Sequence, residues 1–250
     1  MIDVEKSKPE FHAESFTQTG FAHMKENREC EDVCAISEQN NMLFYGLADG
    51  QSGKKYCRIG GEAVLSEIAR YIAERGVQCL SQYEYVDEIQ YEIIKAVRKR
   101  LELLAADSSS EITEYSSTLL ALVIDPETDD YIVIHLGDGG IIGDGIDGSI
   151  KLVSAPENGI TSKYTWLTTS ERALLHLRIS FGKMSNYKRM IMFTDGADAI
   201  AHGANISMAM RKLLKERGDT CQIAHIVERS EPVDDASFIV IDRKSEGSSN

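Results

Sequence analysis

The chain has 250 residues, of which 27% are charged, and its formal net charge at pH 7 is -13. This length can bury a substantial core, and since neither a linker nor a repeat is visible, we expect one domain over residues 1–250, ordered from about 11 to 242 and followed by a flexible tail, 243–250. The negative charge argues against nucleic acid and against an anionic membrane surface as partners, because both would repel the chain.

Membrane and secretion signals are lacking in the sequence. No run approaches the roughly 18 consecutive apolar residues of a membrane span, and the opening MIDVEKSKPE is acidic and polar where a signal peptide would be basic and then apolar. We therefore expect a cytoplasmic protein, with no membrane partner.

The cysteines are odd in number and form no CxxC pair, which indicates reduced thiols. They are Cys30, Cys34, Cys57, Cys79 and Cys221. Cys30 and Cys34 flank an acidic pair, so a zinc or redox role stays open, but small buried hydrophobes are the favoured interpretation.

Strands and then helices are predicted in the first half of the chain. Residues 11–23 and 33–37 have strand patterns, and 42–48 is a continuous apolar run typical of a buried strand. From residue 60 the apolar positions recur at helical spacing until Arg75 and Gly76 provide a stop, and a second amphipathic helix is predicted from 86 to 106.

The second half returns to strands. Residues 118–124 and 131–136 are rich in β-formers and are joined by DPETDD, which predicts a hairpin. A strand is expected over 190–194, helices over 206–217 and 221–229, and a last strand over 237–242. This order of elements indicates an α+β sandwich.

Acidic residues stand at the ends of four strand-like runs. FYGLADG, IVIHLGDG and MIMFTDG each end in Asp-Gly, and VDDASFIVI begins with an Asp pair. Asp49, Asp138, Asp195 and Asp234 therefore lie where sheet gives way to loop. A single Asp-Gly is weak, because it is a common turn dipeptide, but several carboxylates converging on one point favour Mg²⁺ or Mn²⁺.

Two further segments complete an ordered set of six motifs. They are GFAHMKENRECEDVCAI, with a Gly, a His and an acidic pair, and the small Ser/Thr block SSTLLALVI. All six occur in the order typical of the metal-dependent serine/threonine protein phosphatases of the PP2C (PPM) family, which the chain resembles from about Gly20 to Ile241.

The resemblance implies a fold and an activity. The fold is an α+β, PP2C-like four-layer sandwich, in which two packed antiparallel sheets are flanked by helices and the metals lie in a cleft at one sheet edge. The activity is hydrolysis of phosphoserine or phosphothreonine in proteins by attack of a metal-bridging water. The implied cofactors are two Mg²⁺ or Mn²⁺ ions with a possible third, and the implied partner is a phosphoprotein that is the target of a bacterial-type kinase or is such a kinase.

The resemblance also assigns roles around the first metal. Asp49 is the carboxylate that bridges two metals, and the carbonyl of Gly50 joins the first of them. Glu31 reaches this metal through water, and Asp32 lies beside it and orients the attacking water. Asp32 and Asp49 are therefore the catalytic candidates.

Around the second metal, the resemblance assigns Asp195 and Asp234 as ligands. Asp235 takes the place of a residue that is often Asn, so we choose Asp234 of the two neighbours. Asp138 matches the acid that holds a third, weaker metal in bacterial members.

The chain departs from the family pattern in three places. Asn27 replaces the arginine that grips the substrate phosphate in many members, and Arg28 either fills that role through a local shift or is solvated. Gln51 replaces a histidine proposed to protonate the leaving alkoxide, and it cannot donate a proton usefully near neutral pH. Gly139 and Gly140 replace a Ser and an Arg, which loosens the third-metal loop.

Residues 144–188 lack the sequence motifs that are usual in the family. We expect the flap that controls substrate access in this segment. Trp166 lies within this segment, and a core position is favoured over a place in the cleft. His135, His176 and His202 have no ligand partner at useful spacing and are interpreted as structural.

Two other functions stay open. A pseudophosphatase would use the fold to bind a kinase or another partner; the retained aspartates speak against it, and the departures above speak mildly for it. An enzyme acting on a small phosphorylated metabolite would need a deep, closed pocket.

Overall fold

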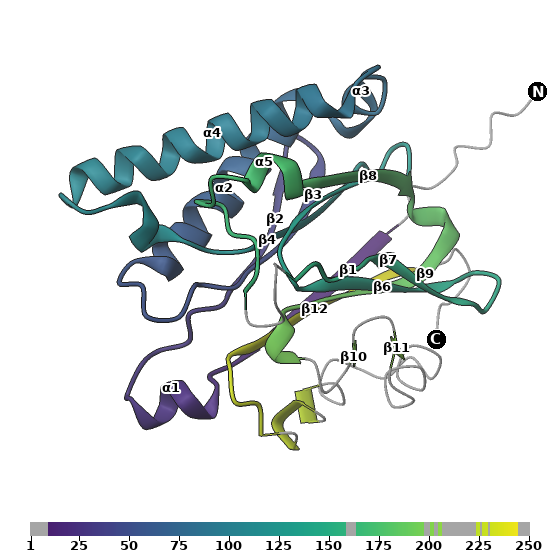
Figure 1. Cartoon of the computed structure of the whole chain (residues 1–250). Coiled ribbons are helices and arrows are strands. Elements are labelled where there is room, and N and C mark those ends of the chain that lie inside the picture. Colours follow the sequence, from purple (N-terminus) through teal and green to yellow (C-terminus); the bar gives the residue numbers. More distant parts are fainter. Residues whose placement is uncertain are drawn as a thin grey trace, which may run out of the picture.

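Two five-stranded antiparallel sheets pack face to face at the centre of the molecule (Figure 1). The computed structural model describes residues 10–158, 164–197, 201–202, 205–206, 224–225, 227–229 and 231–244. The first sheet has the order β2 (Val33–Gln39), β3 (Met42–Ala48), β4 (Leu119–Ile124), β5 (Asp130–Leu136) and β8 (Arg178–Lys183). The second has the order β1 (Glu10–Gln18), β12 (Ala236–Lys244), β9 (Tyr187–Phe193), β6 (Gly140–Gly145) and β7 (Ile150–Ser154).

Two long helices, α2 (Cys57–Arg75) and α4 (Val86–Asp107), cover the outer face of the first sheet (Figure 1). Their burial follows from amphipathic sequences: in α4, Ile89, Ile93 and Val97 recur every four residues and are almost completely buried. The outer face of the second sheet packs against Ala224 and Val227. The prediction of two packed antiparallel sheets with flanking helices is confirmed.

The shorter elements connect these layers. They are the helices α1 (Phe21–Lys25), α3 (Val77–Leu80) and α5 (Ala173–His176), the 3-10 turns η1 (Ile112–Tyr115), η2 (Met184–Asn186) and η3 (Asp195–Ala197), and the strand pair β10 (Ala201–His202) and β11 (Asn205–Ile206). Within the described ranges, no helix is both long and apolar enough to cross a membrane.

The position of strand β4 between two layers explains why its sequence is apolar throughout. All six of its residues are buried, because helices lie on one side of it and the second sheet on the other. Side chains of a strand alternate between faces: those at 119, 121 and 123 contact the helices, and those at 120, 122 and 124 contact the second sheet.

Strand β1 ends earlier than the sequence predicted. It stops at Gln18, and residues 21–25 form α1 instead of continuing the expected strand to residue 23. The N–H groups of Phe21 and Ala22 donate to the carbonyls of Pro232 and Val233. A Cβ on Gly20 would lie 2.3 Å from the carbonyl carbon of Asp234, so the chain turns where only glycine fits.

The remaining strand and helix predictions have mixed outcomes. The hairpin is confirmed as β4 and β5, and the run 42–48 is β3. Helix 60–75 begins three residues earlier than expected, and the last strand extends to Lys244, two residues past the expected end of the ordered core. Of the predicted helix 206–217, only Ile206 is described, and it belongs to strand β11. Of the predicted helix 221–229, residues 224–225 and 227–229 are helical.

Five of the described strands were not predicted: β6, β7, β8 and the short pair β10 and β11. Strand β6 was missed because its sequence, GIIGDG, is rich in glycine, which is depleted in strands. The glycines are needed here: a Cβ on Gly140 or Gly143 would lie 2.6 or 2.5 Å from the rings of Phe193 and Tyr187. Strands β7 and β8 lie in 144–188, where we expected the flap, and β8 pairs with β5 at the edge of the first sheet.

Trp166 and two histidines are structural, as predicted. Trp166 packs against the core beneath the helices and stacks on His176, with ring centroids 3.7 Å apart. His176 contacts Glu157 at 2.7 Å. His135 contacts Ser154 of β7 at 2.7 Å, and burial lowers its pKa to about 3, so the neutral ring links the two sheets. The side chain of His202 lies outside the described residues.

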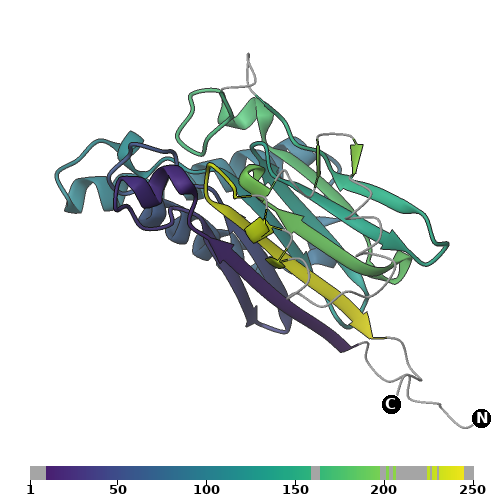
Figure 2. The same cartoon turned by 90° about the horizontal axis from the view of Figure 1, so that it is seen from below.

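The strand directions bring the ends of β3, β5 and β9 and the start of β12 to one edge of the sandwich. Strands β3 and β5 are both antiparallel to β4, so their carboxyl ends share an edge. In the second sheet, Phe193 at the end of β9 pairs with Phe238 near the start of β12. Figure 2 shows β12 beside β1, although they come from opposite ends of the chain.

We predict that Gly60→Ala destabilises the protein. Gly60 lies in α2, where the helix packs against η1. A Cβ at this position would lie 2.0 Å from the carbonyl oxygen of Tyr115, the last residue of η1. Overpacking of this kind costs about 1 to 3 kcal/mol, so the melting temperature should fall by about 2 to 10 °C. The control is Ser66→Ala at an exposed position of the same helix. A variant that melts above wild type would show that helix propensity outweighs the close contact.

Candidate metal centre and active-site cleft

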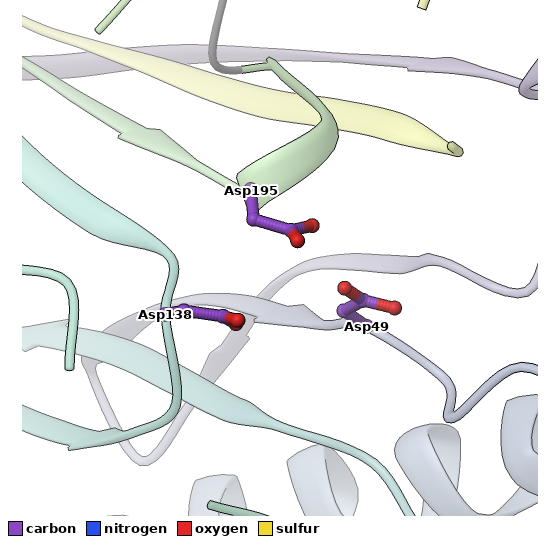
Figure 3. A group of neighbouring side chains, drawn as sticks. All are labelled: Asp49, Asp138 and Asp195. Carbon is purple, nitrogen blue, oxygen red and sulfur yellow. The ribbon is translucent and has the colours of Figure 1, made fainter. Parts of the chain in front are cut away.

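Three aspartates converge at the edge where the sheets meet. Asp49 follows β3, Asp138 lies between β5 and β6, and Asp195 begins η3 after β9. One carboxylate oxygen from each lies within 4.8 Å of the others, and Figure 3 shows the three side chains directed toward a common point. Residues from both sheets therefore form one acidic centre, which is the donor set that a hard divalent cation prefers.

The aspartates line a cleft of about 890 Å³. Gly50 and Asp234 line the same cleft, so five of the residues singled out in the sequence come together here. Hydroxyl side chains make up much of the remaining lining: Ser52, Thr113, Ser116, Thr118, Tyr164, Thr165, Thr169 and Ser170.

The crowded carboxylates make negative charge unfavourable in the cleft. Burial raises the pKa of Asp49 well above its ordinary value, and the charges of Asp32 and Asp195 add to the rise. Burial likewise raises the pKa of Asp195, with a contribution from Asp234. These carboxylates therefore lose their protons less readily than usual, and a bound cation would favour their charged forms.

The acidic pair of the first motif, Glu31 and Asp32, lies beside this centre. Asp32 is 1% exposed; its Oδ2 accepts a hydrogen bond from Thr194 at 2.9 Å, and burial raises its pKa to about 7. The buried carboxylate oxygens Oε2 of Glu31, Oδ1 of Asp32 and Oδ1 of Asp195 have no hydrogen-bond partner among the described residues. Unpaired buried acceptors are costly, and divalent cations with their water would satisfy them. The residues present therefore fit a metal centre.

The two neighbours Asp234 and Asp235 play different parts. Asp234 lines the cleft. Asp235 is 3% exposed, and its carboxylate accepts hydrogen bonds from the N-terminal segment. The donors are the backbone N–H of Gly20 at 2.7 Å, the backbone N–H of Glu31, and Nδ1 of the His23 side chain at 2.9 Å. This geometry favours Asp234 as the ligand, a role that stays a prediction.

Arg28 lies against the acidic pair. Its guanidinium donates to Oε1 of Glu31 and, at 3.2 Å, to Oε2 of Glu26. The hydrogen bond to Glu31 raises the pKa of Arg28. Arg28 is not among the described residues that line the cleft, and its role toward a substrate phosphate stays a prediction.

Several supporting residues were not assigned a role from the sequence. Thr118 accepts the N–H of Asp49 on its hydroxyl at 2.8 Å and donates its own N–H to the carbonyl of Asp49 at 2.8 Å. Thr194 holds Asp32, and His23 is held between Asp235 and Ser52. Thr194 precedes Asp195, Thr118 belongs to the Ser/Thr block and His23 to the first motif, but these positions do not identify the partners.

None of the described cysteines lines the cleft. Among the described residues, Cys30, Cys34, Cys57 and Cys79 are free thiols. Burial raises the pKa of Cys30 and Cys34, and that of Cys57 to about 11, so none of these three is an activated thiolate. Cys221 lies outside the described residues.

Comparison with known proteins identifies the family. The sequence profile described as "Protein phosphatase 2C" matches residues 19–229, and the chain belongs to this family. No curated protein matches the sequence.

Solved structures share the fold at low identity. A bacterial serine phosphatase has a TM-score of 0.69 at 15% identity, covering 95% of this chain and 99% of its own. The serine/threonine phosphatase Stp1 from Staphylococcus aureus has a TM-score of 0.68 at 17% identity, with coverages of 94% and 96%. RsbX, solved with magnesium, has a TM-score of 0.61 at 15% identity, with coverages of 98% and 100%. The PP2C-like fold is thereby confirmed.

The first prediction from the site distinguishes the roles of Asp234 and Asp235 by their effect on the stability of the metal-free protein. Asp235→Asn replaces an acceptor of three hydrogen bonds by an amide that presents its own N–H groups to these donors. We expect a loss of about 3 kcal/mol, or about 6 to 12 °C in the melting temperature in chelator. Asp234→Asn should melt no lower than wild type, because it removes a repelling charge. Equal melting of the two variants would contradict this division.

A second prediction concerns Asp49. Without metal, Asp49→Asn should melt at or slightly above the wild-type temperature, since it relieves repulsion among buried carboxylates. Saturating Mn²⁺ should stabilise wild type by roughly 2.7 kcal/mol at a hundredfold excess over Kd, about 5 to 10 °C, and the variant by much less. The control, Asp107→Asn on the exposed end of α4, should keep the full shift. A full Mn²⁺ shift in Asp49→Asn would remove Asp49 from the metal centre.

Proposed function

We propose that this protein is a Mg²⁺- or Mn²⁺-dependent phosphatase that hydrolyses phosphoserine or phosphothreonine in proteins. The observation that carries the proposal is the convergence of Asp49, Asp138 and Asp195 in a cleft of a PP2C-family chain. The proteins of similar fold include a named serine/threonine phosphatase and one solved with magnesium, which supports both the reaction and the cofactor.

The proposed metal ligands are the residues that line the cleft. Asp49 and the carbonyl of Gly50 would hold one ion, Asp49 would share the second with Asp195 and Asp234, and Asp138 would hold a third; Glu31 would contribute through water. Bound divalent cations would offset charge on the phosphoryl oxygens and make water a stronger nucleophile.

Asp32 is proposed to orient the attacking water. Its Oδ2 is fixed by Thr194, while Oδ1 has no hydrogen-bond partner among the described residues. A fixed carboxylate with one open oxygen suits a water whose lone pair must point at phosphorus. Gln51 lines the cleft but has no acidic proton, so water held by the metals would have to protonate the leaving alkoxide.

The cleft of about 890 Å³ has room for a phosphorylated side chain together with neighbouring polypeptide. The proposed substrate is a phosphoprotein in the cytoplasm, either the target of a bacterial-type serine/threonine kinase or the kinase itself.

We predict metal-dependent turnover of a phosphothreonine peptide and of para-nitrophenyl phosphate. Activity should require Mn²⁺ or Mg²⁺ and vanish in chelator, and Asp195→Asn should lose more than about 100-fold, because it removes a charge from the metal centre. Asp107→Asn serves as the matched control. Absence of turnover at saturating metal would favour the non-enzymatic binding module, and a strong preference for free phosphoserine over the peptide would favour a metabolite phosphatase.

A further inference from the structure

One lysine, Lys54, lines the acidic cleft. Among the described residues that line it, Lys54 is the one cation, beside the carboxylates of Asp49, Asp138, Asp195 and Asp234. A phosphate monoester brings about 1.5 to 2 further negative charges at neutral pH. Its outer oxygens therefore need donors, and charge-assisted hydrogen bonds are the strongest available.

We propose that Lys54 binds the phosphoryl group of the substrate, the role for which the sequence had singled out Arg28. This inference rests on the proposed phosphatase function and names a specificity-determining residue for it.

The backbone around Lys54 is fixed by hydrogen bonds. Its N–H donates to the carbonyl of Gln51 at 3.2 Å, and its carbonyl accepts the thiol of Cys57 at 3.2 Å. The segment is further held by the N–H of Gln51, which donates to the carbonyl of Ser116 at 2.9 Å. Gln51 and Ser116 both line the cleft, so the ammonium extends from a well-defined rim.

The side chain of Lys54 has capacity for a substrate. It is 28% exposed, and the described residues give its Nζ one partner, Oε1 of Glu114 at 3.3 Å. An ammonium has three N–H donors, so two can serve phosphate oxygens without breaking this contact. Glu114 is itself held by the N–H of Lys55 at 3.0 Å, which keeps the ammonium near the cleft.

Arg28 offers less. Both of its terminal nitrogens already donate to carboxylates, one to Glu31 and one to Glu26. These contacts use two of the five N–H donors of the guanidinium, but Arg28 does not line the cleft. Moving to a phosphate in the cleft would take the guanidinium away from Glu31 and leave that largely buried carboxylate without a counter-charge, which is costly. Lys54 requires no such exchange.

The test measures phosphate binding in two ways. With saturating Mg²⁺, Michaelis constants are determined for para-nitrophenyl phosphate and a phosphothreonine peptide, together with the inhibition constant of inorganic phosphate. Lys54→Met keeps the side-chain length and removes the charge. We expect all three constants to rise about 10-fold or more, a smaller change in kcat, partial rescue in Lys54→Arg, and an unchanged metal-induced melting shift.

The matched control is Lys55→Met. Lys55 carries the same charge one residue on, but its ammonium lies over the ring of Tyr56, 4.8 Å from the centroid, and it does not line the cleft. The Michaelis constants and the inhibition constant of Lys55→Met should match those of wild type. Unchanged constants in Lys54→Met would overturn the inference, as would a rise in Arg28→Met alone. A rise confined to the peptide would also overturn it, because the ammonium would then contact the polypeptide.

Failure of the proposed function is recognised separately. If wild type shows no metal-dependent turnover, calorimetric titration of inorganic phosphate into the Mg²⁺-loaded protein still tests Lys54. Binding that is weakened in Lys54→Met but not in Lys55→Met would support the phosphate site, and equal binding in both variants would reject it.

Discussion

Repulsion among buried carboxylates is the constraint on which the rest of the structure depends. Two unit charges ~4 Å apart repel by about 4 kcal/mol at an effective dielectric near 20, and Asp49, Asp138 and Asp195 bring oxygens within 4.8 Å. No local element would assemble such a group spontaneously. The apolar layer between the sheets does so, because the aspartates follow strands whose side chains are buried in that layer.

The hydrogen bonds around the centre explain how the loops keep this arrangement. Asp235 ties together three points of the N-terminal segment, Thr118 fixes the backbone of Asp49, and Thr194 fixes Asp32. These contacts are buried or partly buried and join protein groups without a metal. The scaffold is thus held by one set of polar groups, while another set is left with unsatisfied oxygens that a cation can bind.

Elements with a strong periodic pattern were predictable, and elements defined by their neighbours were not. Helix α4 and the hairpin of β4 and β5 follow from side-chain spacing that hardly depends on context. Strand β6 has a glycine-rich sequence that disfavours a strand in isolation, and it exists because Phe193 and Tyr187 occupy the space that side chains would need. Helix α1 replaces the end of a predicted strand because the backbone hydrogen-bonds to residues more than 200 positions away.

For the site, the sequence by itself determined which acidic residues gather at the cleft: the ordered acidic motifs place Asp49, Asp138, Asp195 and Asp234 at strand ends, where alternation and turn formation are local properties. Only the tertiary structure decided how neighbours divide their work. Asp234 faces the cleft while Asp235 holds the scaffold, and Lys54 reaches the cleft while Arg28 is paired with Glu31. Such choices depend on which oxygens and nitrogens meet across the two sheets, and this distance information is absent from the order of residues along one chain.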